Sequence, residues 1–360
     1  MDQLLLRRSW WFGFLGFAFL LDGSLAWTRW LFLFFLAPVV ADVLHVARRA
    51  GGAAEREDGS DAGSVHGSVD GSVDGSVDRA PELPLPGPAA ADGPFFFGLR
   101  CTISDALALL HPRQRRQVIR QARGERRARE RVGQWDPTPG DFVPRVEYDL
   151  PFEGEWYVAG DGAWYAAGAS GSRQLRAHRW ALDLVVVGVD GRTHAGDGSR
   201  LEHYHAYGRA VLAPADGQVV EVVGGVRDAP WVGTGWLDWR APEIGGNSIT
   251  IRHADGEFSH LAHLAPGSIG VRAGEWVRRG QPIARCGNSG HSTEPHLRFQ
   301  LQDHPDCYQA VGLPALFCRV RVNGDPLPHT LHLQRGMRVS SSSGDHPSAT
   351  LLAAIENDGA

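Results

Sequence analysis

Histidines recur at the ends of strand-like runs in the second half of the chain, and they are the residues best suited to chemistry. The run GNSITIRHADGEFSHLAHL (246–264) reads as a hairpin that ends in a His-Leu pair at His263. The run VRRGQPIARCGNSGHSTEPHLRF (277–299) has a strand, a glycine-rich loop and a second strand that presents His296. Imidazole binds zinc, and it also takes the proton of a water that attacks a carbonyl carbon. Metal binding and proton transfer are therefore the chemistry that these positions could support.

Composition excludes several other kinds of site. All 36 basic residues are Arg, and the absence of Lys excludes Schiff-base and Ser-Lys chemistry. The four cysteines are widely spaced and form no CxxC pair, so a zinc knuckle does not fit. The net charge of -5 is too small and too mixed to indicate nucleic acid as a partner.

The elements that must position the histidines are short strands. Forty-five Gly and 22 Pro with 21% charged residues predict many turns and a β-rich domain, not a helical bundle. Asn323-Gly324 is a hairpin signal for two closing strands. The predicted fold class is mainly β, a compact antiparallel sheet over residues 145–335. Its strand-like runs are WALDLVVVGV, RAVLAP, GQVVEVV, NSITIRH, EFSHLAHL, PHLRFQL and CRVRV.

Four segments together resemble, in order and spacing, the lysostaphin/LytM-type zinc metalloendopeptidases. They are HRWALDL, APADGQVVEVV, GNSITIRHADGEFSHLAHL and VRRGQPIARCGNSGHSTEPH, within residues 150–320. The resemblance implies a compact antiparallel β domain with a groove and a zinc held by two His and one Asp. It also implies hydrolysis of peptide bonds in peptidoglycan-type cross-links, so the expected relatives are peptidoglycan endopeptidases.

The resemblance assigns site residues position by position. Asp183 matches the carboxylate ligand, His263 the catalytic histidine of the second motif, and His296 the first, catalytic histidine of the third motif. His178 is the best candidate for the first histidine ligand, and it precedes Asp183 by five positions, one more than the family's usual HxxxD spacing. The position two after His296, where the family has its other histidine ligand, is Arg298.

Arg298 makes two hypotheses compete. By strand alternation it projects on the same face as His296, and Arg has no lone pair with which to bind a metal. In one hypothesis the domain is still a zinc endopeptidase, with an altered metal shell. In the other, favoured here, Arg298 pairs with Asp183 and replaces the metal. The domain is then a pseudoenzyme that needs no cofactor and binds a peptide, a cell-envelope polymer or a protein partner in its groove.

Two other arrangements stay open. His203 and His205 form a same-face HYH pair that a rearranged metal site could recruit. Alternatively, His263 and His296 could face each other as in the sugar-phosphotransferase IIA-type carriers, which work without any metal. His253 stands before an Ala-Asp-Gly turn and is expected to support the hairpin.

Residues 1–50 are far more apolar than the rest of the chain. Residues 9–21 and 30–41 carry no charge over 13 and 12 residues, and Asp22-Gly23-Ser24 between them reads as a turn. We expect a membrane anchor of two short spans that contacts lipid. The side of the membrane that carries the β domain stays open, because the flanking arginines favour a cytoplasmic domain whereas a cell-wall substrate requires an external one.

Three further segments surround the β domain. Residues 51–96, with their GSVD repeats, predict a disordered linker, and residues 336–360 predict a disordered tail. Residues 97–144 predict a basic helical segment, in which residues 113–131 hold nine Arg against two Glu. Such a helix either rests on anionic headgroups or packs on the main domain. We favour packing, through Leu107, Leu110, Val118 and Ile119.

Overall fold

The computed structural model describes residues 83–84, 86–160, 176–327 and 331–342. The expected membrane hairpin and most of the predicted linker lie outside these ranges. Among the described helices, none is both long and apolar enough to cross a bilayer. Helices and strands described below all belong to one compact unit, which runs from Ser76 to Ala360.

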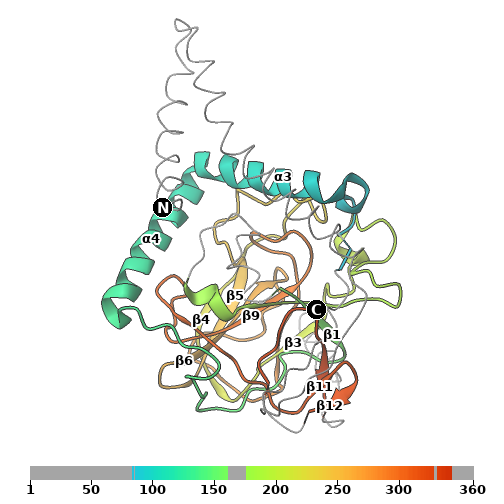
Figure 1. Ribbon diagram of the computed structural model, residues 1–360. Coiled ribbons are helices and arrows are strands. Elements are labelled where there is room, and N and C mark those ends of the chain that lie inside the picture. The colour runs from blue at the N-terminus through green and yellow to red at the C-terminus, as the bar shows by residue number, and fades with distance from the viewer. Residues whose placement is uncertain (1–82, 85, 161–175, 328–330, 343–360) are drawn as a thin grey trace, which may run out of the picture. The chain divides into compact units, whose positions relative to one another are not determined.

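An antiparallel sheet organises the domain (Figure 1). Its strand order is β12-β11-β13-β1-β2-β9-β6-β5-β4-β7, with β10 beside β9, and β3 pairs with β8 in a separate two-stranded sheet. The predicted fold class, mainly β with antiparallel pairing, is confirmed. The strands are β1 Trp156–Gly160, β2 Leu182–Val185, β3 Ala210–Leu212, β4 Gly217–Val223, β5 Asn247–Ala254, β6 Glu257–Leu264, β7 Trp276–Val277, β8 Pro282–Arg285, β9 Leu297–Gln302, β10 Gly312–Leu313, β11 Val320–Val322, β12 Asp325–Pro326 and β13 Arg338–Ser341.

Alternation along the central strands separates an apolar face from a polar one. Leu184 of β2, Phe299 of β9 and Leu261 of β6 are fully buried in the core. The side chains between such residues point the other way. The cross-strand register places Asp183 opposite Arg298, His260 opposite Gln300, and Thr250 opposite His260. We call this second surface the polar face; it consists of Asp183, Arg298, Gln300, His260 and Thr250.

The end of the chain departs from prediction. Residues 338–341 form β13, which pairs with both β1 and β11, so the disordered tail predicted over 336–360 is wrong for these residues. The physical reason is one apolar side chain, because Val339 is fully buried in the core while the rest of the strand is polar. The hairpin signal at Asn323-Gly324 is confirmed, since both residues have positive φ in the turn between β11 and β12.

Two helices precede the sheet. Helix α3 covers Ala89–Leu110 with a kink at Gly93, and α4 covers Pro112–Val132. Helix α3 therefore begins inside the range 51–96, and the predicted linker does not extend through residues 89–96. The reason is local, because a run of alanines with high helix propensity opens the helix. Figure 1 shows α3 and α4 on the outside of the β domain, meeting near Pro112.

Helix α4 packs on the β domain through polar and small side chains. Its buried residues are Gln114, Gln117, Gly124 and Ala128, whereas Ile119 is exposed. The expected packing through Ile119 is therefore wrong. The amides of Gln114 and Gln117 donate to the carbonyl oxygen of Ala241 at 2.9 and 3.0 Å. Loop carbonyls on the domain surface need donors, and glutamine supplies them where an apolar side chain cannot.

Arginines at the edge of α4 join two loops of the β domain. Arg120 donates to Glu243 at 3.1 Å and stacks over the ring of Tyr308, with 4.4 Å between the guanidinium carbon and the ring centre. Arg131 forms a two-pronged ion pair with Asp303 at 2.6 and 3.0 Å. The hydroxyl of Tyr308 also donates to Glu243 at 3.1 Å. Helix α4 therefore holds the loop around residue 243 and the loop 303–309 together.

Gly124→Ala should destabilise the protein even though alanine is the better helix former. An added Cβ would overlap the carbonyl group of Tyr308, so α4 must move away from loop 303–309. Alanine gains about 1 kcal/mol of helix propensity over glycine, whereas overpacking costs about 1–3 kcal/mol. We expect a net loss of about 1 kcal/mol in thermal unfolding of the full chain and faster tryptic cleavage within α4. Arg123→Ala, at an exposed position of the same helix, is the control, and equal stability of the two variants would contradict the packing.

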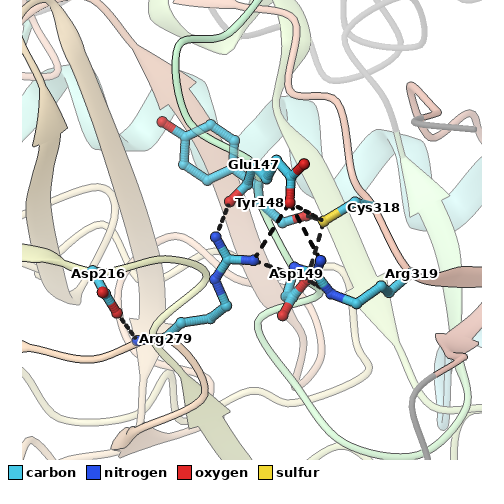
Figure 2. A network of polar contacts seen from close by, with 7 residues as sticks. All are labelled: Glu147, Tyr148, Asp149, Asp216, Arg279, Cys318 and Arg319. Atoms are coloured by element: carbon cyan, nitrogen blue, oxygen red, sulfur yellow. Dashed lines mark hydrogen bonds and ion pairs between the residues drawn. The ribbon is translucent and has the colours of Figure 1, made fainter.

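A second polar network joins the segment before β1 to the segment before β11. Figure 2 shows Glu147 and Asp149 between Arg279 and Arg319. Arg319 donates to Asp149 at 2.6 Å, and Arg279 donates to the backbone carbonyl of Glu147 at 2.9 Å. The thiol of Cys318 lies 3.2 Å from the Asp149 carboxylate. Burial and this carboxylate raise the pKa of Cys318 to about 11, so the thiol stays protonated at neutral pH.

Candidate functional site

The centre of the candidate site is an ion pair between neighbouring strands. Arg298 Nε donates to Asp183 Oδ1 at 2.9 Å, and Arg298 Nη2 donates to Asp183 Oδ2 at 3.2 Å. Both side chains are largely buried, at 13% and 14% exposure. Burial alone would raise the pKa of Asp183, but Arg298 and His296 outweigh it and hold that pKa well below its usual range. The carboxylate is therefore ionised at any physiological pH, and its charge is neutralised by Arg298.

His263 reaches the polar side of the sheet through a break in strand pairing. Ile249 pairs with Leu261 and Asn247 pairs with Leu264, so β6 has one residue more than β5 between these pairs. His263 occupies this bulge with a positive φ of 62°, held by its N–H to Gly245 at 2.8 Å. Simple alternation would point His263 into the core beside Leu261. The bulge turns it toward His296 instead, with 4.5 Å between ring centres.

Backbone carbonyls orient both of these histidines. The Nδ1 of His263 lies 2.8 Å from the Ser289 carbonyl, and the Nδ1 of His296 lies 2.8 Å from the Glu294 carbonyl. A carbonyl only accepts, so Nδ1 carries a proton in both rings. Burial and the nearby charges hold the pKa of His263 well below its ordinary value, so its Nε2 keeps a lone pair. Within the described ranges neither Nε2 has a hydrogen-bond partner, although that of His296 lies 3.5 Å from Asp183 Oδ1. These are the two positions that the resemblance marks as catalytic.

His178 lies in the 3-10 turn Arg176–Trp180, directly before β2. Its pKa is held well below the ordinary value by burial, by Arg298 and by His260, so it belongs to the same electrostatic cluster. The residue four positions before Asp183 is Arg179, whose guanidinium pairs with Asp136. Arg179 therefore has its own acidic partner, whereas His178, the predicted candidate, has a pKa that is lowered by the charge of Arg298.

The structure adds a histidine that resemblance passed over. His260 sits on the polar face opposite Gln300, and its Nδ1 lies 2.9 Å from the hydroxyl of Thr250. Burial lowers its pKa to about 4, and Arg298 contributes to that shift. The sequence EFSHLAHL predicts this position, because side chains alternate along a strand and His260 must face away from the core if Leu261 faces it.

The chain's own loops cover one end of the polar face. Gly245 lies over it, since a Cβ there would be 3.4 Å from the Cβ of Ala262 and 3.8 Å from Nε2 of His260. The amide of Gln302 donates to His304 O at 2.7 Å, which brings loop 303–309 onto the same side. Gln300 and Gln302 are consequently fully buried. The end that holds Asp183 and Arg298 keeps partial exposure.

Two other histidines, His203 and His253, have structural roles. His203 Nδ1 lies 3.0 Å from Asp197, in the 3-10 turn Leu201–His203. His253 bridges the carbonyl of Asp216 and the hydroxyl of Ser259, each at 2.8 Å, which confirms that it supports the hairpin. The structure therefore gives His203 an ordinary ion-pair partner instead of bringing it to the candidate site.

A zinc ion does not fit the donor set of this site. The described residues contain no group of three His, Cys, Asp or Glu side chains placed to hold a metal. Both carboxylate oxygens of Asp183 accept hydrogen bonds from Arg298, and Arg298 occupies the position where the family has a histidine ligand. A guanidinium cannot bind a metal ion and does not lose its proton in proteins. The residues therefore suit an ion pair and not a metal ion.

Buried neutral histidines should make the domain sensitive to mild acid. Burial lowers the pKa of His253, His260 and His291 to about 4 each, whereas an unfolded histidine titrates near about 6.5. Between these values the unfolded chain binds protons that the folded chain does not, so stability falls as pH drops from about 6.5 to 4. Each histidine should cost about 2 kcal/mol between pH 7 and 5. Thermal midpoints of the full chain at the two pH values test this, and His253→Asn should shrink the difference. Equal midpoints would contradict the burial of these groups.

In a comparison with known protein families, residues 201–309 match the model of Peptidase family M23. This range contains His263, His296 and Arg298, whereas His178 and Asp183 lie before it. Glycyl-glycine endopeptidase ALE-1 of Staphylococcus capitis is 31% identical over 115 residues, which are 32% of this chain and 26% of that protein. Lysostaphin of Staphylococcus simulans is 30% identical over 115 residues, 32% of this chain and 19% of the relative.

Similarity is confined to part of each relative, because the match spans about a quarter or less of these two proteins. The solved structure of lysostaphin from Staphylococcus simulans is similar over 36% of this chain and 39% of that chain, with 23% identity and a TM-score of 0.23. The predicted resemblance to lysostaphin/LytM-type peptidases is confirmed by the family model and by the sequence relatives. Residues 201–309 are thus the part of the chain that resembles peptidase family M23.

Proposed function

We propose that this M23 domain works without zinc, does not hydrolyse peptide bonds, and binds a peptide segment at the exposed end of its polar face. The observation that carries the proposal is the two-pronged Asp183–Arg298 ion pair. It puts a permanent positive charge where the family has a metal ligand, and it neutralises the one carboxylate that the resemblance assigns to the metal.

Magnitudes favour the ion pair over a metal. A unit charge about 4 Å from a divalent ion costs on the order of 8 kcal/mol at an effective dielectric constant of 20. Structural zinc is bound with roughly 10–16 kcal/mol when all ligands are present. The loss of one ligand together with this repulsion leaves almost no affinity. Arg298 would have to leave Asp183 before zinc could enter.

The ligand class follows from the groups that lack partners. The Nε2 atom of His263 is an acceptor, and no donor within the described residues satisfies it. A buried acceptor without a partner costs about 1–3 kcal/mol, so a ligand that brings N–H donors gains that amount on binding. A peptide backbone offers such donors at regular spacing. ALE-1 is named for cleavage at glycyl-glycine, so an oligoglycine peptide is the first probe.

Metal analysis of the full-length chain tests the first half of the proposal. After purification without chelators and dialysis against micromolar zinc, we expect far less than one zinc per chain. Calorimetric titration with pentaglycine and with an alanine-containing cross-link peptide tests the second half, and His296→Phe should abolish the binding. Stoichiometric zinc together with peptide cleavage would establish the alternative, an active endopeptidase with an altered metal shell.

We further propose that residues 1–50 anchor the chain in a membrane. Support comes from the two uncharged runs at 9–21 and 30–41 and from the arginines that flank them. The test is alkaline extraction of membranes from cells that produce the full chain. The chain should stay in the pellet, and deletion of residues 9–41 should release it. Release of the undeleted chain would refute the anchor.

A further inference from the structure

The outward side of α4 carries a cluster of arginines that the β domain does not use. Arg115, Arg116, Arg123 and Arg127 are exposed, and none has an acidic partner in the described part of the chain. Arg115 and Arg116 lie about two helical turns before Arg123, and Arg127 follows one turn after it, so the four side chains lie along one side of the helix. Ile119 lies in the middle of this side with 48% of its surface exposed. We call Arg115, Arg116, Ile119, Arg123 and Arg127 the arginine face.

The orientation of this face is fixed by the packing of α4. The opposite side of the helix is buried against the β domain through Gln114, Gln117, Gly124 and Ala128. Arg120 and Arg131, at the border between the two sides, are already paired with Glu243 and Asp303. The domain therefore neutralises the border arginines and leaves the arginine face to solvent or to a partner.

We propose that the arginine face binds the anionic headgroups of a phospholipid bilayer. Basic side chains on a helix are attracted to an anionic lipid surface, and each adds to the binding. An apolar residue that faces the bilayer adds buried apolar area to this electrostatic attraction. Ile119 supplies that residue, and its exposure has no explanation within the described part of the chain.

The rest of the chain favours lipid over nucleic acid as the anionic partner. Residues 9–21 and 30–41 are uncharged and rich in Phe, Leu and Trp, which gives the same chain a second signal for a membrane. The arginine face also has no aromatic side chain on which a base could stack.

Hydrogen exchange on the full-length chain in nanodiscs tests the proposal. One set of discs contains phosphatidylcholine alone, and the other contains about 30% phosphatidylglycerol, a composition chosen to give a strong surface potential. Amides of peptides within 113–131 should exchange at least tenfold more slowly on the anionic discs. Exchange in β5 and β6 should be the same on both. The protection should fade in high salt, because the attraction is screened.

Matched variants separate the arginine face from charge in general. Arginine-to-glutamine changes at 115, 116, 123 and 127 should remove the protection. The control makes the same four-charge change at exposed arginines elsewhere on the domain, namely Arg192, Arg252, Arg272 and Arg278. Protection that persists in the first variant, or is lost equally in the control, would overturn the proposal. So would protection of α4 by a short DNA duplex on phosphatidylcholine discs when anionic lipid gives none.

Discussion

Replacing Arg298 by histidine should give a chain that carries about one zinc ion, far more than we expect for the natural chain. The change removes the guanidinium from Asp183 and places an imidazole on β9, two residues after His296. His178, Asp183 and the new imidazole then provide the two His and one Asp that the family uses. Relief of a repulsion of on the order of 8 kcal/mol, with one ligand gained, should raise zinc affinity by several orders of magnitude.

Two comparison variants give this experiment its meaning. Arg298→Gln removes the same charge without adding a ligand and should bind little zinc. His178→Ala, combined with Arg298→His, should lose the zinc again if His178 is the first ligand. Zinc content is measured by mass spectrometry of the metal after dialysis. If Arg298→His holds no more zinc than Arg298→Gln, the assignment of His178 and Asp183 as ligand positions is wrong.

Arg298→Met should be among the most destabilising single changes in the domain. It leaves the carboxylate of Asp183 largely buried without the guanidinium that neutralises it. Breaking a buried ion pair on one side costs about 3–5 kcal/mol. We expect the lower end, about 3 kcal/mol, because the Asp183 side chain keeps 14% exposure and water can solvate part of its charge.

The contribution of Asp183 to the pH dependence of stability should reverse in sign in this variant. In the natural chain Asp183 has a depressed pKa, so its stabilising effect is present at neutral pH and is lost only in strong acid, below the unfolded value of about 4. Without Arg298, burial raises that pKa, and protonation of Asp183 then favours the folded state. The stability difference between Arg298→Met and the natural chain should therefore shrink from pH 7.5 to pH 5.5.

Denaturant titration of the full chain measures both effects. The double change Asp183→Asn with Arg298→Met removes the buried charge together with its partner, so it should recover most of the loss. A single variant as stable as the natural chain would show that Asp183 and Arg298 are not energetically coupled.

Regular alternation made the centre of the site predictable. Asp183 and Arg298 lie on strands whose alternate residues are apolar, so their common face followed from the sequence, and the structure joins them in adjacent strands. Alternation does not predict the direction of the His263 side chain, because a bulge and a positive φ determine it. A register irregularity depends on how two strands fit their neighbours, and the sequence of one strand does not encode it.

Packing through polar groups escaped prediction for a different reason. The search for an apolar stripe on α4 pointed to Ile119, yet the helix docks through two glutamines, a glycine and an alanine. These side chains meet backbone carbonyls of a loop about 125 residues further along the chain. Pattern reasoning recognises buried faces by hydrophobicity, so an interface made of amide donors and close backbone approach gives no periodic signal.

The position of β13 has a consequence for how the protein is made. This strand is the last one described, yet it lies between β1 and β11 in the sheet. During synthesis β1 emerges about 180 residues before its neighbour, and one edge stays open until residue 341 has left the ribosome. An open edge can pair with another chain. A fragment ending at residue 335 would lack β13, so we expect it to aggregate although it holds every residue of the candidate site.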